Sequence, residues 1–554
     1  MYRGRDVVRV IVRCLVALAV LGIAPCGQSL AASLEETFRQ AQEAFKAGNH
    51  ASAGRLFEQA GNQMHAQGDS ARAALLWGNA AVAMLKAEDY AAAAEIYERI
   101  LGTGKALAPD VALRAYKNLA LCRGHLGQRA LQVAVIERML KALPKLPPEE
   151  AADAWARQGD AYRALELYTP AAASYAKAVR LLPAKAAPDA RAKILTALGL
   201  CQGNLGDFDS AAKSLAQART LAEKANSPLT LAEAGSNLGI LLWERGEYPE
   251  ARAHLQEALN LEKQAGLRRS EGIDSNNMGL VLKSVGKHKE AMRLVEDALV
   301  IAREVGNARD EGIARVNRAL INRIAGQVKE ARADYREAVK LFEQSGFQEG
   351  MAGALLGMGK MAELEDKNYT QALENYEKAL AVYERLHLAR GHAETLLQIA
   401  GLYKRMVAPS RASRDLVFDD TPVVPDITPD EALKKSRAYY TQALKEAEKL
   451  RSREMIWSSL QGLGYADLRE GRLESALDRY DKAIGMVSAM YAALDSVEML
   501  GEYMAGKEDL YGEAQEVCAA LYRKTGNAQY LDRQLRLAET LRNEFVIGVR
   551  GKVR

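Results

Sequence analysis

A periodic recurrence of small residues is the feature that most constrains how this chain can fold. These residues return at nearly constant intervals in successive units, at Ala41, Ala81, Ala120, Gly159, Gly199, Gly239, Gly279, Ala319 and Gly359. An array of this kind indicates stacked copies of one helical unit, because each copy buries its apolar face only against its neighbours.

The clearest unit runs from Ala154 to Pro183. Small and large residues alternate in it at fixed places, namely Trp155, Gly159, Tyr162, Ala171, Tyr175, Ala178 and Pro183. Small side chains let two antiparallel helices approach closely, and large ones fill the space between them. The pattern resembles the tetratricopeptide repeat (TPR), and the length of its period resembles that of the repeats of kinesin light chain and Pins-type adaptors. The resemblance implies an all-α, right-handed superhelical solenoid of about eleven helical hairpins with C-terminal capping helices.

The repeats divide the chain into four segments after an N-terminal leader. We expect repeats 1–9 over residues 34–390, repeat 10 over 391–450, repeat 11 over 451–488 and a helical cap over 489–554. Repeat 10 contains an insertion, 407–429, in which four prolines exclude a helix. We interpret this insertion as disordered; the alternative is a functional loop. Its aspartates do not have the spacing of a calcium-binding loop.

The C-terminal helices carry a second, less specific resemblance. The run from Ala519 to Phe545 looks like the helical connector that follows the repeats in TPR–CHAT proteins, before their caspase-like peptidase domain. The catalytic histidine and cysteine of that domain have no counterpart in this sequence.

Residues 1–31 have the composition of a signal peptide. Arg3, Arg5, Arg9 and Arg13 precede the apolar run Cys14–Pro25, and small residues follow at Ser29 and Ala31. We therefore expect cleavage near Ala31 and export, to the periplasm. The alternative is a lipoprotein attached through Cys26, which Pro25 disfavours; membrane contact is expected only through that lipid or through a partner.

The sequence contains no motif of catalysis, metal binding or phosphate binding. The seven histidines have no metal-ligand spacing with each other or with cysteine. We therefore expect no enzyme activity, no cofactor, no metal and no small-molecule substrate. The net charge of +4 over 554 residues is too small to indicate nucleic-acid binding. The three cysteines beyond the leader, Cys122, Cys201 and Cys518, are interpreted as inert core thiols.

An asparagine recurs at one place of three successive units, as Asn237, Asn277 and Asn317. The TPR resemblance implies that this place faces the concave groove. An asparagine side chain can donate and accept at once, so a ladder of them can grip the backbone of an extended peptide. Kinesin light chain and Pins-type repeats are known for such a ladder. The alternative is that the three amides are merely solvated.

Neighbouring inward places supply the other candidate peptide-binding residues. Trp243, Lys283 and Arg323 share one such place in successive repeats, and Asn276 occupies another. Arg315 and Arg323 could form a basic spot with Arg318, suited to a carboxylate. For Arg318 itself we favour a guanidinium that reaches past its neighbours to water.

Two functions are compatible with these features. The first is an exported, non-enzymatic scaffold for protein–protein interaction that binds an extended segment of a partner in its concave groove. The second is the regulatory or sensing half of a CHAT-type peptidase system whose catalytic domain is encoded elsewhere.

Overall fold

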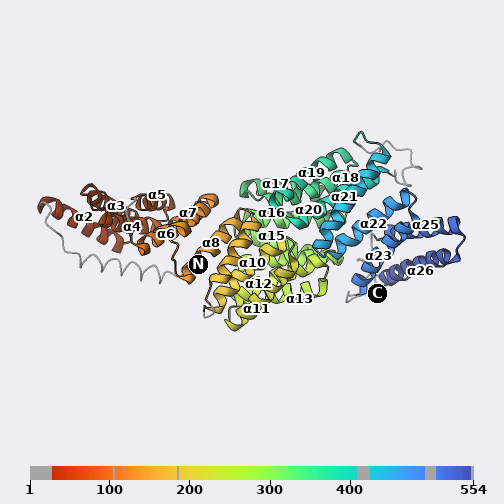
Figure 1. The fold of residues 1–554 in the computed structure, drawn as a ribbon, viewed down its shortest axis with the longest axis horizontal. Coiled ribbons are helices and arrows are strands. Elements are labelled where there is room, and N and C mark those ends of the chain that lie inside the picture. The colour runs from red at the N-terminus through yellow and green to blue at the C-terminus, as the bar shows by residue number, and fades with distance from the viewer. Residues whose placement is uncertain (1–27, 104–106, 184–185, 408–424, 493–506, 551–554) are drawn as a thin grey trace. The chain divides into compact units, whose positions relative to one another are not determined.

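The computed structural model describes residues 28–103, 107–183, 186–407, 425–492 and 507–550. These residues form helices joined by short turns, and no strand occurs among them. Consecutive helices pair as antiparallel hairpins (Figure 1). The pairs of the first unit are α2 (Gln28–Lys46) with α3 (His50–Ala66), α4 (Ser70–Lys86) with α5 (Tyr90–Gly102), and α6 (Pro109–His125) with α7 (Arg129–Ala142).

The chain divides into two compact units, residues 1–146 and 147–554. The second unit holds the remaining repeats and a C-terminal helix pair. Its pairs are α8 (Pro148–Ala164) with α9 (Tyr168–Leu181), α10 (Pro188–Asn204) with α11 (Phe208–Lys224), α12 (Pro228–Arg245) with α13 (Tyr248–Ala265), α14 (Arg268–Ser284) with α15 (His288–Glu304), α16 (Ala308–Ile324) with α17 (Val328–Ser345), α18 (Gln348–Leu364) with α19 (Tyr369–Leu386), α20 (Ala389–Val407) with α21 (Pro429–Lys449), α22 (Arg453–Arg469) with α23 (Leu473–Ala492), and α25 (Glu508–Thr525) with α26 (Ala528–Arg550).

Inside each hairpin the recurring small residue of the first helix faces a large residue of the second. A Cβ added to Gly159 would lie 2.7 Å from the ring of Tyr175, and one added to Gly279 would lie 2.7 Å from Val295. Tyr175 and Val295 are 1% and 0% exposed. The all-α solenoid of about eleven hairpins predicted from the repeat is therefore confirmed, with α25 and α26 following the last hairpin.

Apart from α20–α21, whose connection lies largely outside the described residues, the turn inside each hairpin contains one residue in the left-handed region. Glycine usually occupies it, as at Gly246 (φ 79°), because it has no Cβ to clash there. Glu166 holds this place in the hairpin α8–α9, with φ 60°. Its side chain has a structural role: the two carboxylate oxygens accept the backbone N–H groups of Gln348 and Glu349 at 3.2 and 2.9 Å. Glu166 thus supplies acceptors for the N-terminus of α18, which lies far away in sequence.

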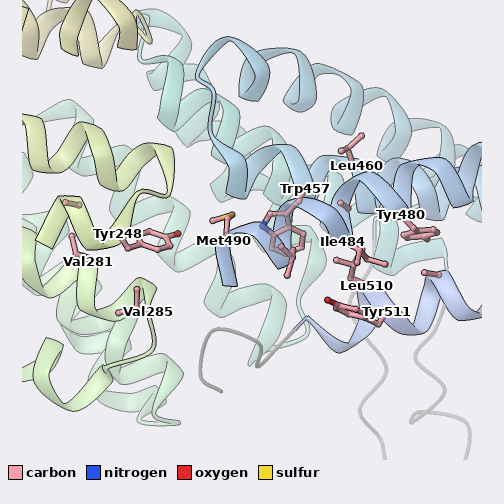
Figure 2. Packing of buried hydrophobic residues seen from close by; sticks show 14 of the residues in the cluster. Tyr248, Val281, Val285, Trp457, Leu460, Tyr480, Ile484, Met490, Leu510 and Tyr511 are labelled. Atoms are coloured by element: carbon pink, nitrogen blue, oxygen red, sulfur yellow. The ribbon is translucent and has the colours of Figure 1, made fainter. Parts of the chain in front are cut away.

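Further contacts of this kind join early and late repeats of the second unit. Arg451 pairs with Asp209 at 2.8 Å, and the hydroxyl of Tyr168 donates to Glu349 at 3.1 Å. One buried cluster contains side chains of α13 and α14 together with side chains of α22, α23 and α25 (Figure 2). In a simple solenoid each repeat contacts only its neighbours. Here side chains from early repeats of the second unit also meet side chains from its last repeats, and a cavity lies between them.

Three of the predicted segments lie wholly or partly outside the described residues. These are the leader up to residue 27, positions 408–424 of the insertion, and part of the cap at 493–506 and 551–554. The C-terminal pair packs on the last repeats: Glu513 of α25 accepts from Lys404 at 2.6 Å and from Tyr480 at 3.2 Å. Among the described residues, no helix is both long and apolar enough to cross a membrane.

Candidate binding site on the inner helices

A cavity of about 370 Å³ lies between α12, α14, α20 and α22. Trp243 and Lys283, two residues predicted from the repeat, line it together with Arg390, Glu394 and Trp457. The indole Nε1 of Trp243 donates to Ser284 at 2.8 Å, and the guanidinium of Arg390 lies 4.3 Å from the ring centroid. The tryptophan is therefore held in a fixed orientation by contacts from two repeats.

Basic and acidic side chains both line this cavity: Lys283 and Arg390 lie with Glu244, Glu394 and Glu454. Lys360 pairs with Glu394 at 3.2 Å, and Arg390 lies 3.6 Å from Glu244. Lys283 has no ion-pair partner among the described residues, and burial lowers its pKa to about 8, against the effect of Glu394. Burial alone would raise the pKa of Glu394, but Lys360 and Arg390 hold it below its ordinary value. Burial raises the pKa of Glu244 to about 7, although Arg390 opposes this.

A second cavity, of about 320 Å³, lies at the other end of α14. Asn276 and Asn277 line it, and three arginines, Arg163, Arg269 and Arg309, surround it. Arg269 is neutralised by Asp310 at 2.7 Å, and Arg309 stacks 3.7 Å from the ring of Phe347.

Hydrogen bonds leave a different group unused on each of the two asparagines of this cavity. The amide nitrogen of Asn317 donates to the carbonyl oxygen of Asn276 at 2.9 Å, so Asn276 keeps its own amide nitrogen for another partner. The amide nitrogen of Asn277 donates to Asp274 at 3.1 Å, so Asn277 keeps its carbonyl oxygen. Neighbouring residues thus present one donor group and one acceptor, which is the hydrogen-bonding complement of a peptide unit.

The structure distributes the predicted residues among different environments. Asn317 is 6% exposed and sits between α14 and α16, where it bonds Asn276 rather than facing an open groove. Asn237 is half-buried, with no side-chain hydrogen bond among the described residues. Arg323 acts on Lys283 through its charge, and its Nε is buried without a partner in the described part of the chain.

Arg315 lies away from Trp243 and Lys283, on a groove of about 810 Å³ formed by α15, α16 and α17. It pairs with Glu311 at 2.9 Å and with Asp334 at 3.1 Å. Arg318, for which we favoured contact with water, instead donates from Nε and Nη2 to the same Asp334, which is 3% exposed. Two arginines of the predicted basic spot, Arg315 and Arg318, are therefore paired with the carboxylates of Asp334 and Glu311.

Several residues of these cavities were missed from the sequence. Arg390, Glu394, Lys360 and Glu244 come together only because α18 and α20 return to α12 and α14. Arg163 lines the second cavity from α8, three repeats before the asparagines. No spacing in the sequence signals these contacts, since they depend on the pitch of the whole array.

The described residues hold no cluster of metal ligands, and their cysteine thiols are buried. No set of three or more histidine, cysteine, aspartate or glutamate side chains is placed there to hold a metal ion. The three thiols are free and buried, and burial raises the pKa of Cys122 and of Cys201 to about 12. Such thiols are poor nucleophiles at neutral pH.

Comparison with known proteins agrees with the geometry. Residues 190–264, 230–299 and 270–344 match one tetratricopeptide repeat model, and residues 152–184 match another. No curated protein matches the chain.

Solved structures are similar in fold at low sequence identity. A Rap protein complexed with Competence and Sporulation Factor superposes with a TM-score of 0.50 at 14% identity, covering 68% of this chain and 98% of its own. The apo form of RapI gives 0.40 at 12% identity, over 54% and 98%. BtubC from P. vanneervenii gives 0.32 at 17% identity, over 40% and 91%.

Proposed function

The chain is a tetratricopeptide repeat protein, and we propose that it is a non-enzymatic scaffold that binds an extended segment of a partner protein on the inner helices of residues 147–554. The observation that carries the proposal is the pair Asn276 and Asn277, which offers one amide donor and one carbonyl acceptor inside a cavity. Such a pair binds main-chain atoms whatever the side chains are, as required for an extended segment.

The cavity at Trp243 supports the same proposal. It offers an aromatic ring held by Arg390 and a half-buried lysine, Lys283, without an ion-pair partner among the described residues. An immobilised aromatic side chain in a pocket is typical of residues that contribute most to binding energy. A Rap protein with this fold was solved with Competence and Sporulation Factor bound, and we propose an analogous use of the fold here.

The test is a variant that removes the acceptor; it also removes one donor to Asp274, whose oxygen still accepts from Ser236. Asn277→Ala is expected to weaken binding of the partner by about 1–3 kcal/mol, because a buried polar group of the ligand loses its hydrogen bond. The partner would be captured on full-length protein from native extract, and its bound segment titrated by calorimetry. Asn260→Ala, on the exposed face of α13, is the matched control. Equal affinity of wild type and Asn277→Ala would contradict the proposal.

Asn317→Ala does not serve this purpose. It would leave the buried carbonyl of Asn276 without a donor and should therefore lower stability as well as binding.

We also propose that the protein is exported after removal of its leader. The arginines and apolar run of residues 1–25 support this, and the mature chain is expected to begin near residue 32. Intact-mass measurement of protein purified from the source cells checks the cleavage position. A mature protein that retains residues 1–31 would contradict export by this route, and a lipid-modified Cys26 would favour the lipoprotein alternative.

The peptidase-associated alternative remains a prediction. It rests on the resemblance of residues 519–545 to the TPR–CHAT connector.

A further inference from the structure

Two carboxyl groups are buried together beneath the candidate asparagine pair. Asp274 on α14 is 1% exposed, and Glu262 on α13 is 3% exposed. Each has one oxygen, Oδ2 of Asp274 and Oε2 of Glu262, that is buried and has no hydrogen-bond partner in the described structure. A buried carboxylate without a partner carries a large desolvation cost.

No cation among the described residues compensates these groups. The charged residues that act on the pair are Glu233 from α12 and Glu271 from α14, and both are acidic. Glu271 is itself paired with Arg268 at 3.1 Å, and Arg268 also bonds to Glu304 of α15 at 3.0 Å; Arg163 and Lys193 act on Glu233. A metal ion is a poor candidate to fill this role, since the described residues provide no group of three such ligands here. A proton is the simplest species that removes the charge.

The hydrogen bonds decide which of the two groups holds the proton. One oxygen of Asp274 accepts both the hydroxyl of Ser236, from α12, and the amide of Asn277. These donors favour the ionised form of Asp274. Glu262 has no such donor in the described structure. Burial raises the pKa of both groups, and the negative charge of Asp274 raises that of Glu262 further, to about 8.

We infer that Glu262 is protonated in the folded protein at neutral pH, and that this proton allows Asp274 to stay ionised and to orient Asn277 for ligand binding. The second half of this inference rests on the proposed function. When the pH rises and Glu262 loses its proton, two negative charges face each other in the interior. The contact among α12, α13 and α14 is then weakened, and the acceptor of Asn277 is no longer held toward the cavity.

Protonation of Glu262 should also affect the stability of the fold when no ligand is bound. The ordinary pKa of glutamate is 4.5, and that of folded Glu262 is about 8. Between these values the folded state binds more protons than the unfolded chain, so Glu262 makes stability fall as the pH rises through this range.

Glu262→Gln tests the site, because glutamine has the shape of the protonated acid and cannot ionise. We expect its melting temperature to exceed that of wild type by about 3 °C or more at pH 9, with a smaller difference at pH 6. Glu250→Gln, at an exposed position of the same helix, is the control and should follow wild type. Parallel melting curves of wild type and Glu262→Gln across this pH range would overturn the inference.

Infrared difference spectroscopy gives a direct second readout. The carbonyl band of protonated carboxylic acids should lose intensity between pH 7 and pH 9 in wild type. In Glu262→Gln this band should be weaker at pH 7, because only other buried carboxyl groups such as Glu244, whose pKa is about 7, still contribute to it. Unchanged bands would overturn the assignment of the proton to Glu262, whatever happens to the melting temperature.

Partner affinity separates this inference from the proposed function. Once the partner segment is identified, its affinity should fall more steeply between pH 7 and 9 for wild type than for Glu262→Gln, in which Lys283 still titrates over this range. Equal pH dependence in both proteins would overturn the coupling to Asn277. Failure of the proposed function itself would appear instead as unaltered binding by Asn277→Ala at pH 7.

Discussion

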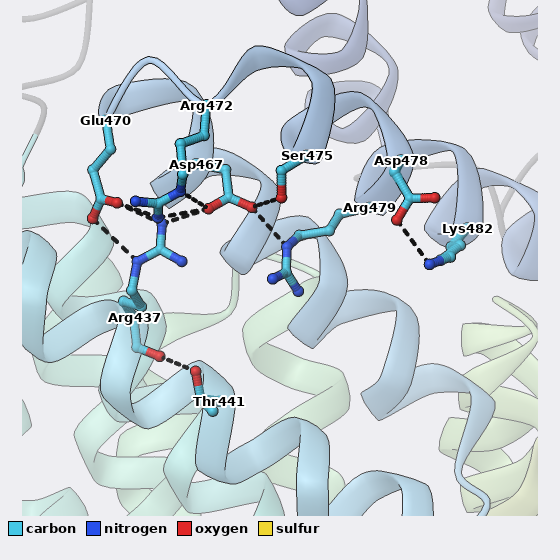
Figure 3. Close-up of polar contacts among 9 residues, drawn as sticks. All are labelled: Arg437, Thr441, Asp467, Glu470, Arg472, Ser475, Asp478, Arg479 and Lys482. Carbon is cyan, nitrogen blue, oxygen red and sulfur yellow. Dashed lines mark hydrogen bonds and ion pairs between the residues drawn. The ribbon is translucent and has the colours of Figure 1, made fainter.

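Asp467→Asn is expected to lower the free energy of unfolding by about 3 kcal/mol, because it removes the negative charge on which three arginines converge. Asp467 lies on α22 and is 1% exposed. Its oxygens accept from Arg437 at 2.7 Å, Arg472 at 2.7 Å and Arg479 at 2.7 Å (Figure 3). A fourth donor, the hydroxyl of Ser475, also lies at 2.7 Å. The carboxylate thus links α21, α22 and the start of α23.

The expected loss in the free energy of unfolding depends on how exposed the three arginine side chains are. The side chains of Arg437, Arg479 and Arg472 are 24%, 29% and 49% exposed, so water can partly solvate them after the substitution. We therefore expect a loss at the low end of the range for broken buried ion pairs. Urea denaturation of the full chain, followed by circular dichroism, measures it.

The stability that Asp467 contributes should also depend on pH in acid solution. Burial alone would raise its pKa, but Ser475 and the arginines hold the pKa of Asp467 well below the usual range. The stabilisation is therefore complete above the pKa of an unfolded aspartate, about 3.9, and is lost as the pH falls below it. The difference between wild type and Asp467→Asn should accordingly shrink in acid.

Asp478→Asn is the matched control for this experiment. Asp478 lies on the neighbouring helix α23 and pairs with Lys482 at 2.7 Å, but both side chains are about 60% exposed (Figure 3). An exposed pair of this kind contributes little, about 0.5 kcal/mol or less. If both variants lose the same amount, the buried network does not have the role assigned to it.

The contacts inside each hairpin could be predicted from the sequence because they are local. Gly159 meets Tyr175 and Gly279 meets Val295 at the same separation along the chain, which is set by one turn between two helices. The same spacing recurs in many repeats, so the sequence specifies the packing of the two helices inside a hairpin many times over.

The contacts between distant repeats could not be predicted in this way. Glu166 reaches Glu349 only because the pitch of the array brings the fourth repeat beside the ninth. A small change in the angle between successive hairpins accumulates over the intervening repeats. The sequence pattern specifies each hairpin but does not determine that angle, so Arg390 and Glu394 were missing from the predicted site.

The asparagine series shows a related limit. Asn277 and Asn317 occupy equivalent places, yet the first lines a cavity and the second is buried against Asn276. Equivalent backbone positions have different environments because their neighbours differ. Likewise, the Arg318 side chain is 26% exposed, but its guanidinium also pairs with Asp334, which lies buried in the next helix and which the sequence did not indicate.

Gly279→Leu tests the repeat register itself and is expected to destabilise the second unit by about 3 kcal/mol or more. A Cβ at this position would lie 2.7 Å from Val295 and 3.3 Å from the backbone oxygen of Ala291, and a leucine adds three further carbons in the same direction. Because the oxygen belongs to the backbone of α15, relief requires α14 and α15 to move apart, which would open the hairpin that carries Asn276 and Asn277.

The control is Gly485→Leu, at a helical glycine of α23 where an added Cβ meets nothing within 4 Å. Leucine favours a helix over glycine by roughly 1 kcal/mol, so this variant should be as stable as wild type or more stable. The two variants make the same chemical change in a helix and differ in the space available. A Gly279→Leu protein that unfolds at the same denaturant concentration as Gly485→Leu would mean that the small residues of the repeat do not set the approach of the helices. A large loss confined to Gly279→Leu would instead establish that the recurring glycine is retained for packing, since a helical glycine otherwise only weakens the helix.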